Sequence, residues 1–399
     1  MKKFKRIFLI VMDSAGIGHG KDADKFDDLG TNTFGHISEK MPNGLNIPVL
    51  NSLGIADLDE IKGCHKVDHP KSFSIKLNEA SSGKDTMTGH WEMMGIKTTK
   101  PFQTFTDTGF PKELIDELEK ETGHKIIGNY ASSGTEILKV LGEEQIRDNS
   151  LIVYTSSDSV LQIAAHEEKT GLEELYRCCE IARKLCMKPE WFVGRIIARP
   201  YLGTNKDNFK RTSNRHDYTI SPSGVTAMDI LKNNGYVVSC VGKINDIFNG
   251  VGVSETVHTI SNQDGMDKTI DLVKKESFKE GFCFVNLVEF DSEFGHRRNP
   301  LGYGNAIEEF DVRLGEMLKD LREDDLVMVT ADHGNDPTYK GTDHTREKVP
   351  LLIYSQLIKD GKYLDERDSF ADIGATVLKN FNLELDKTMI GKPINEIFN

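Results

Sequence analysis

Aspartate and histidine residues stand directly behind, or a few residues beyond, several short apolar runs of this sequence. Their side chains supply carboxylate oxygens and imidazole nitrogens, a mixture that suits Mn²⁺, Zn²⁺ or Fe²⁺, whereas Ca²⁺ prefers oxygen ligands alone. The candidate ligands are Asp13, Asp291, His296, Asp332, His333 and His344. These ligands are too many for one closed tetrahedral site, so the pattern predicts two metal ions.

A segment with two threonines supplies a candidate nucleophile. Residues 82–92 read Ser-Gly-Lys-Asp-Thr-Met-Thr-Gly-His-Trp-Glu, and the small residues permit a tight turn ahead of a helix N-terminus, where backbone amides favour phosphate. Metal coordination converts a hydroxyl, a weak nucleophile at its own pKa, into an alkoxide near neutral pH. From this segment alone, a plain Ser/Thr-rich turn with a helix cap is the simpler explanation. Composition does not distinguish Thr86 from Thr88.

Taken together, the candidate ligands and the hydroxyl predict phosphoryl transfer. Two metal ions about 4 Å apart, with a hydroxyl nucleophile, form a clamp for in-line displacement at phosphorus. In the alternative interpretation, the aspartates cap helices and the histidines pack in the core. That alternative explains any single residue, but it does not explain why all of them gather near strand ends. We therefore predict a two-metal enzyme with a covalent phosphothreonine intermediate.

The apolar runs predict the strands that must position these side chains. Short continuous runs are typical of strands buried on both faces of a parallel sheet, and they span residues 6–12, 151–155, 237–241, 282–288, 326–330 and 350–354. Helical spacing of apolar residues lies between them, in residues 112–121, 172–185, 266–275, 306–321 and 370–381. This alternation predicts an α/β fold with a mostly parallel sheet flanked by helices. Ligands of such sheets bind beyond the carboxyl ends of the strands, where the candidate residues converge.

Length, charge and cysteine content exclude several classes of protein. The chain has 399 residues, enough for two or three domains, and its 50 basic and 63 acidic residues give a formal charge of −13, which argues against general nucleic-acid binding. No run of about 18 apolar residues occurs, so no membrane-spanning helix is expected. The short apolar N-terminus predicts a strand rather than a signal peptide. The cysteines form no Cys-x-x-Cys pair, and we expect them to be small buried residues of a reducing, cytoplasmic protein.

The middle of the chain differs in composition from the rest, because it contains basic and aromatic segments. Two basic and aromatic segments, residues 193–201 and 211–218, follow a helix and an apolar stretch. We interpret residues 101–217 as an inserted domain. The catalytic core would then be discontinuous, made of residues 1–100 and 218–399.

Five segments are long and specific enough to identify a family. They are residues 11–18, 83–92, 157–168, 290–298 and 330–337, and they closely resemble the bacterial phosphopentomutase family, a member of the alkaline phosphatase superfamily. The resemblance covers essentially the whole chain, with no departure at a motif position. It implies an alkaline-phosphatase-like core and an inserted α+β cap domain.

The resemblance also implies a reaction and a set of roles. The reaction interconverts ribose 1-phosphate or 2-deoxyribose 1-phosphate with the 5-phosphate, through phosphorylated Thr86 and a pentose 1,5-bisphosphate, and a sugar bisphosphate primes the enzyme. Two Mn²⁺ ions are implied, with Thr86 beside the first. The ligands of the first ion are Asp13, Asp332 and His333, and those of the second are Asp291, His296 and His344.

The resemblance implies that the substrate is a small pentose phosphate, and we expect side chains of the inserted segment and of one core strand end to contact it. A closing cap keeps water from a phosphorylated threonine and shelters the bisphosphate while it reorients. Ser156 and Asp158 are candidates for the sugar hydroxyls. The candidates for phosphate are Arg195, Arg199, Arg211 and Lys243, for which a solvated basic face is the alternative.

Two other classes of protein compete with this interpretation. One is another metal-dependent phosphatase or a cofactor-independent phosphoglycerate mutase of the same superfamily, which resembles this chain in its core. The phosphoglycerate mutase uses a serine nucleophile and a longer chain. The other is a non-catalytic metal-binding or scaffold protein with a decayed site. Decay should remove ligands or the nucleophile, whereas every motif position is filled here.

Overall fold

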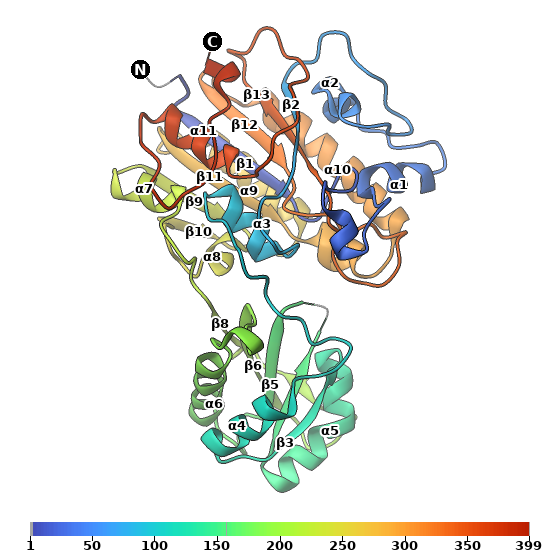
Figure 1. Cartoon of the computed structure of the whole chain (residues 1–399), viewed down its shortest axis with the longest axis vertical. Helices are drawn as coiled ribbons and strands as arrows, with labels where there is room; N and C mark the ends of the chain where they lie inside the picture. Colours follow the sequence, from blue (N-terminus) through green and yellow to red (C-terminus); the bar gives the residue numbers. More distant parts are fainter. Residues whose placement is uncertain (1–2, 157, 399) are drawn as a thin grey trace. The chain divides into compact units, whose positions relative to one another are not determined.

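The structure is a computed structural model that describes residues 3–156 and 158–398. The chain folds into two compact units, which Figure 1 shows with the chain coloured by sequence. The first, here called the core unit, comprises residues 1–101 and 221–399. The second, the inserted unit, comprises residues 102–220. The chain therefore leaves the core unit once, folds the inserted unit and returns.

A seven-stranded sheet organises the core unit. Five neighbouring strands run parallel, and β13 is antiparallel to both of its neighbours. In sheet order the strands are β10 (Glu255–Val257), β9 (Val237–Val241), β11 (Gly281–Leu287), β1 (Arg6–Met12), β12 (Asp325–Thr330), β13 (Val349–Tyr354) and β2 (Phe73–Leu77). Every residue of β1, β11 and β12 is buried, as strands covered on both faces require. The predicted α/β class with a mostly parallel sheet is confirmed.

Helices form two layers in the core unit (Figure 1). The helices of one layer are α1 (Thr33–Lys40), α2 (Pro48–Ser52), α9 (Asn262–Lys274) and α10 (Pro300–Lys319), which pack around α10. The helices of the other are α3 (Thr86–Met93), α7 (Ala227–Asn233), α8 (Ile244–Ile247) and α11 (Asp372–Asn380). Strand β11 contacts α9 of the first layer and α8 of the second, which places the sheet between them. Within the described part of the chain, no helix is both long and apolar enough to cross a membrane.

The inserted unit has its own mixed sheet and two small cores. Its strands are β3 (Ile126–Ala131), β4 (Leu151–Thr155), β5 (Val160–His166), β6 (Arg195–Leu202), β7 (Lys210–Arg211) and β8 (His216–Thr219). Its helices are α4 (Lys112–Thr122), α5 (Gly134–Asp148) and α6 (Leu172–Leu185). Residues of β4 alternate between faces: Leu151 and Val153 join the core under α4 and α6, whereas Ile152 and Tyr154 join the core under α5. Residue 157, which opens one of the segments that carry the family resemblance, lies outside the described residues.

The strand register brings distant parts of the sequence to one edge of the core sheet. Val11 of β1 pairs with Thr330 of β12, and Met12 pairs with Leu287 of β11. The three strands therefore end side by side. Whatever polar residues follow them share the carboxyl edge of the sheet, where α/β folds bind ligands.

At the opposite end of β1, a buried ion pair joins the sheet to the helix layer. Arg6 donates from Nε to Asp325 Oδ1 (2.8 Å) and from Nη2 to Asp325 Oδ2 (2.5 Å), and both side chains are fully buried. Arg6 Nη1 also donates to the Val273 carbonyl of α9 (2.8 Å). Because both charges lie away from water, each depends on the other for compensation.

Asp325→Asn tests this dependence. We expect the free energy of unfolding to fall by about 3–5 kcal/mol, because the Arg6 guanidinium stays buried and loses its anion. Denaturant unfolding followed by circular dichroism measures the loss. The matched control is Asp368→Asn, which breaks the exposed pair of Lys21 and Asp368 (2.6 Å) and should cost about 1 kcal/mol or less. Equal losses in the two variants would contradict the expectation.

Candidate active site

Three buried side chains meet where β1 and β12 end. His333 Nε2 lies 3.5 Å from Asp13 Oδ1 and 3.3 Å from Asp332 Oδ2. One ligand atom from each of the three residues lies within 4.8 Å of the others. Asp13 directly follows β1, and Asp332 and His333 follow β12, so the sheet register alone accounts for their meeting. We call this group the first centre.

The first centre directs two carboxylate oxygens and an imidazole nitrogen toward one another, and each of these atoms can offer an electron pair. His333 Nδ1 lies 3.0 Å from the Gly334 carbonyl oxygen, which can only accept, so Nδ1 carries a hydrogen. In the neutral ring, Nε2 then offers a lone pair toward the two carboxylates. Asp13 Oδ1 and Asp332 Oδ2 are buried and have no hydrogen-bond partner among the residues that the structure describes. The buried His90 Nδ1 lies 3.1 Å from Asp332 Oδ2, but it is closer to the Thr86 carbonyl oxygen (2.9 Å). Converging buried acceptors of this kind fit a divalent cation.

The charges of the first centre lead to the same conclusion. Burial and the neighbouring Asp332 carboxylate raise the pKa of Asp13 above its ordinary value. Burial opposes the imidazolium form of His333, yet Asp332 and Asp13 together hold the His333 pKa well above its ordinary value. The cluster therefore favours a positive charge at Nε2, and either a proton or a metal ion can supply it.

Neighbouring groups hold the outer oxygen of each carboxylate. Asn286 Nδ2 donates to Asp13 Oδ2 (2.8 Å), and the Ser14 backbone amide donates to Asp332 Oδ1 (3.0 Å). Each aspartate thus has one oxygen fixed and the other directed into the centre. Sequence reasoning missed Asn286, although a signal was present: it is a buried polar residue within the apolar run of β11.

A second group of three side chains lies beside the first. Asp291 Oδ2 is 3.0 Å from His296 Nε2 and 3.5 Å from His344 Nε2, and the two Nε2 atoms are 3.1 Å apart. His296 Nδ1 is 2.7 Å from the Thr342 carbonyl oxygen, so Nδ1 is the protonated nitrogen and Nε2 faces the cluster. We call Asp291, His296 and His344 the second centre. Two imidazoles and one carboxylate suit the same transition metals as the first centre.

The second centre is tied both to the loop behind it and to the first centre. Asn335 Nδ2 donates to Asp291 Oδ1 (2.7 Å), and Arg298 Nη1 in turn donates to Asn335 Oδ1 (2.5 Å). Although burial opposes ionisation, His296 and His344 hold the pKa of Asp291 well below its ordinary value. The ring centroids of His333 and His344 are 4.0 Å apart, so all six side chains form one continuous site.

The structure distinguishes the two candidate threonines, Thr86 and Thr88, by the contacts of their hydroxyls. Thr86 is the first residue of α3, and its Oγ1 lies 3.1 Å from His333 Nε2. Thr88 is fully buried, and its Oγ1 donates to Asp85 Oδ2 (2.6 Å), the residue that caps the helix. Only the Thr86 hydroxyl faces the first centre, where an electrophile can reach it.

A buried arginine holds the loop that carries Thr86. Arg346 Nη1 donates to Glu79 Oε2 and to the Gly83 carbonyl, each at 2.5 Å. Its Nη2 donates to the Ser81 carbonyl at 2.8 Å. Sequence reasoning did not identify Arg346, because its partners are remote in sequence and only the fold brings them together.

The predicted substrate contacts are divided between the two units. Lys243 belongs to the core unit, where it is exposed at the start of α8, behind β9. The other five belong to the inserted unit. There, Arg195 lies 3.5 Å from Asp158, Arg199 Nε donates to Gln162 (3.0 Å), and the Ser156 carbonyl accepts from Thr106 (2.8 Å).

Arg199 and Arg211 share a cavity of about 600 Å³ in the inserted unit. Further cations line the same cavity, namely Lys139, Lys206, Lys210 and Arg215. The cavity is therefore strongly basic, and it suits an anion rather than an apolar ligand. Arg195 does not line it.

Comparison with known proteins places this site within a family. Residues 5–385 match the model of the Metalloenzyme superfamily. Proteins named phosphopentomutase are 58% identical over 394 residues in Clostridium beijerinckii, covering 99% of both chains, and 56% identical over 396 residues in Agathobacter rectalis, covering 99% of this chain and 100% of that one. A solved phosphoglycerate mutase of Leishmania mexicana shares 11% identity at a TM-score of 0.48, covering 98% of this chain and 97% of that one. The chain therefore belongs to the phosphopentomutase family, isomerases of the intramolecular phosphotransferase type within the alkaline-phosphatase-like metalloenzymes.

Proposed function

We propose that this enzyme interconverts the 1-phosphate and 5-phosphate of ribose or 2-deoxyribose in the cytoplasm. The observation that carries the proposal is the convergence of the Thr86 hydroxyl with two adjacent groups of buried acceptors (Thr86 Oγ1 to His333 Nε2, 3.1 Å). Relatives at 56–58% identity, named for this reaction, support the choice of substrate. Their near-complete coverage of the chain disfavours a phosphatase or a phosphoglycerate mutase that shares only the core.

We propose that Asp13, Asp332 and His333 hold one divalent ion, and that a second group holds the other. That second group is Asp291, His296 and His344. Mn²⁺ is our choice because mixed nitrogen and oxygen ligands suit it, although the same donors also accept Zn²⁺ and Co²⁺. When bound, the ions supply charge neutralisation for a phosphoryl group and a lowered pKa for the Thr86 hydroxyl.

In the proposed cycle, Thr86 carries a phosphoryl group between two positions of the sugar. The free hydroxyl of a pentose phosphate attacks the phosphorus of phospho-Thr86, loses its proton as the new O–P bond forms, and displaces Thr86 Oγ1. The product is a pentose 1,5-bisphosphate. After it reorients, Thr86 Oγ1 attacks the other phosphate, so the sugar leaves with its phosphate moved and the enzyme is phosphorylated again. A sugar bisphosphate primes the cycle.

The position of Thr86 at the start of α3 supports this role. The first amides of a helix lack intrahelical acceptors and carry partial positive charge, which favours a phosphoryl group there. Asp85 occupies the capping position and accepts from the Thr88 amide (3.0 Å). The backbone that presents Thr86 is therefore fixed before any phosphate arrives.

We propose that the inserted unit acts as a cap that excludes water from phospho-Thr86. In this role Ser156 and Asp158 bind sugar hydroxyls, while Arg195, Arg199 and Arg211 bind phosphate. Lys243 adds a phosphate contact from the core unit. The basic cavity lined by Arg199 and Arg211 supports a distal phosphate site in the inserted unit.

Replacement of Thr86 distinguishes a covalent mechanism from direct transfer. Thr86→Val should lower kcat/KM by about 10⁴-fold or more, because no other hydroxyl replaces the nucleophile, and it should abolish labelling by a ³²P-labelled sugar bisphosphate. Thr88→Val is the matched control and should retain labelling, because the Thr88 hydroxyl is held by Asp85. Full activity of the Thr86 variant would falsify the covalent cycle.

The fate of phosphate distinguishes a mutase from a phosphatase. The protein is stripped of metal with a chelator and supplied with ribose 1-phosphate and a trace of sugar bisphosphate, and then Mn²⁺ is restored. Samples quenched with excess chelator are examined by ³¹P NMR. We expect no reaction before Mn²⁺, ribose 5-phosphate after it, and no growth of the inorganic phosphate signal. Accumulating inorganic phosphate without ribose 5-phosphate would identify a phosphatase instead.

Asn286→Leu tests the support of the first centre. Loss of the amide that holds Asp13 should raise the Mn²⁺ concentration for half-maximal activity by about 10–100-fold, while kcat at saturating Mn²⁺ stays near the parent value. Direct calorimetric titration should show the same loss of affinity. The matched control is Asn380→Leu, which removes another buried asparagine, bonded to the backbone of Phe4. That control should lose stability without a change in metal dependence; an equal change in both would refute a specific role.

A further inference from the structure

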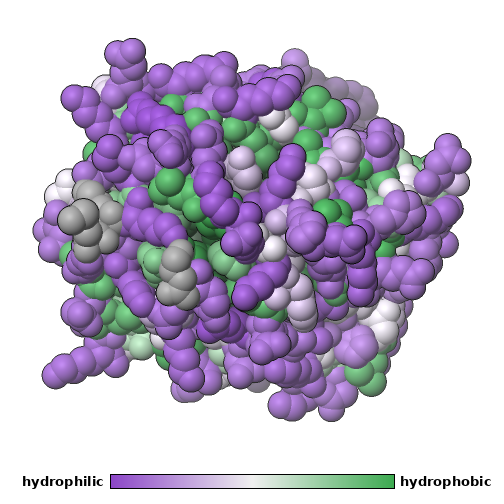
Figure 2. Space-filling view, turned by 90° about the horizontal axis from the view of Figure 1, so that it is seen from above, coloured by the Kyte–Doolittle hydropathy of each residue, from purple (hydrophilic) through white to green (hydrophobic). Residues whose placement is uncertain are grey.

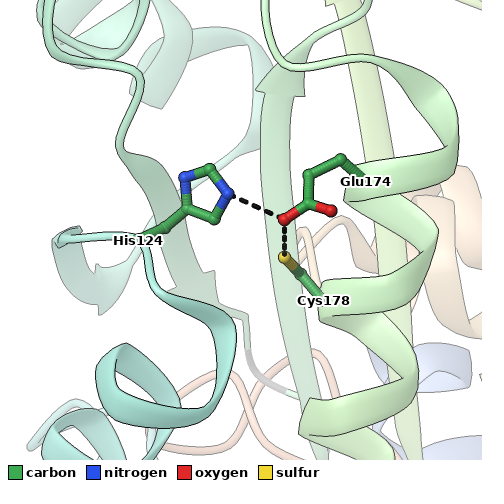
Figure 3. A group of neighbouring side chains, drawn as sticks. All are labelled: His124, Glu174 and Cys178. Carbon is green, nitrogen blue, oxygen red and sulfur yellow. Dashed lines mark hydrogen bonds and ion pairs between the residues drawn. The ribbon is translucent and has the colours of Figure 1, made fainter.

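The inserted unit contains a second cluster of potential metal ligands, made by His124, Glu174 and Cys178 (Figure 3). His124 lies in the turn between α4 and β3, whereas Glu174 and Cys178 lie one turn apart on the same face of α6. His124 Nε2 is 2.9 Å from Glu174 Oε1, and Cys178 Sγ is 3.7 Å from the same oxygen. The proposed function uses none of these residues, so the cluster requires its own explanation.

The orientation of the imidazole is fixed from behind. His124 Nδ1 is 2.8 Å from the Asn149 carbonyl oxygen, which accepts only, so Nδ1 carries the hydrogen. In the neutral ring, Nε2 would carry a lone pair, and Figure 3 shows this side of the ring facing the Glu174 carboxylate, whose oxygen also contacts the Cys178 sulfur. A histidine whose second nitrogen donates to a backbone carbonyl is the usual arrangement of a zinc ligand.

The spacing of the three donor atoms fits tetrahedral zinc. Zinc bonds of about 2.0–2.3 Å to nitrogen, oxygen and sulfur place neighbouring ligand atoms about 3.3–3.6 Å apart. The observed separations of 2.9 and 3.7 Å bracket this range, and all three atoms lie within 4.8 Å of one another. The pairs that include Glu174 therefore already lie within about half an ångström of the zinc spacing.

We propose that His124, Glu174 and Cys178 form a zinc site in the inserted unit, with water as the fourth ligand. On binding, the Cys178 thiol and the Nε2 atom of His124 each release a proton to solvent. Sγ and Nε2 then donate the freed electron pairs to the ion, while Nδ1 keeps its hydrogen. Arg177 Nη2 gives up its contact with Glu174 Oε1 (2.6 Å) and retains the contact of Nε with Oε2 (2.8 Å).

The local charges match these protonation changes. Arg177 and His124 lower the pKa of Glu174 to about 2, so this ligand is a carboxylate at neutral pH. Burial and the neighbouring Glu174 raise the pKa of the Cys178 thiol to about 12, so uptake of the metal must release the thiol proton. Because the Glu174 side chain is partly exposed (32%), an ion can reach the cluster from solvent.

A bound ion would tie the turn between α4 and β3 to α6. In the described structure, the ion pair of His124 with Glu174 already spans these elements. Zinc replaces this contact with coordinate bonds and stabilises the folded inserted unit by mass action. This inference is independent of the proposed reaction, since no residue is shared between the two.

Cobalt substitution tests the site in the full-length enzyme. Co²⁺ bound to thiolate gives a near-ultraviolet charge-transfer band, and the two proposed catalytic centres contain no cysteine. We expect titration with Co²⁺ to produce this band, and Zn²⁺ to remove it by competition. Absence of the band in the parent protein would overturn the proposal and leave His124 and Glu174 as a simple ion pair.

Adjacent cysteines provide the matched control. Cys178→Ser should abolish the band, whereas Cys179→Ser, next to it on α6 and equally buried, should retain it. His124→Gln should weaken Co²⁺ affinity by about tenfold or more. Circular dichroism verifies that each variant is folded. Retention of the band in the Cys178 variant, or its loss in the folded Cys179 variant, would assign the thiolate elsewhere and overturn the site.

Discussion

The constraint on which this site depends is the convergence of buried electron-pair donors at one edge of a sheet. His333 Nε2 lies within 3.5 Å of one carboxylate oxygen of Asp13 and one of Asp332, and neither oxygen has a hydrogen-bond partner among the described residues. In a region shielded from water, such an arrangement is unfavourable unless a positive charge lies at its centre. A metal ion bound there would resolve the conflict, and in the proposed mechanism it would also create the reactive centre.

The surrounding fold keeps the donors in place against their mutual repulsion. Hydrogen bonds from Asn286 and the Ser14 amide hold the outer carboxylate oxygens of the first centre, and Asn335 does the same for Asp291. Arg346 fixes the neighbouring loop by several hydrogen bonds to its backbone. Most of these groups lie at strand ends or in the loops that directly follow the strands. The rigid sheet therefore holds the side chains of the site in fixed positions.

An acidic protein can bind an anionic substrate when the local field differs from the net charge. The chain carries a formal charge of −13, and the two centres contain three aspartates at the place where phosphate is proposed to bind. The two divalent ions proposed here would reverse that local sign, because their charge would exceed that of the carboxylates. The basic cavity of the inserted unit adds a second positive region. In the proposed mechanism, the net acidity would serve solubility, while the metals and the arginines would attract the anionic substrate.

The sequence by itself determined the kinds of ligand and the class of fold. Continuous apolar runs ending in Asp13 and Asp332 predicted buried parallel strands and a polar edge, because burial on both faces leaves a pattern that is local in the chain. The tertiary structure decided what depends on contacts between distant residues. It directed Thr86, and not Thr88, at His333, and it brought Asn286 against Asp13. It also placed His124 beside Glu174 of α6. The spacing of these residues in the sequence does not indicate that they form a cluster. Strand register and helix packing determine these contacts between distant residues. Neither can be read from the order of neighbouring residues.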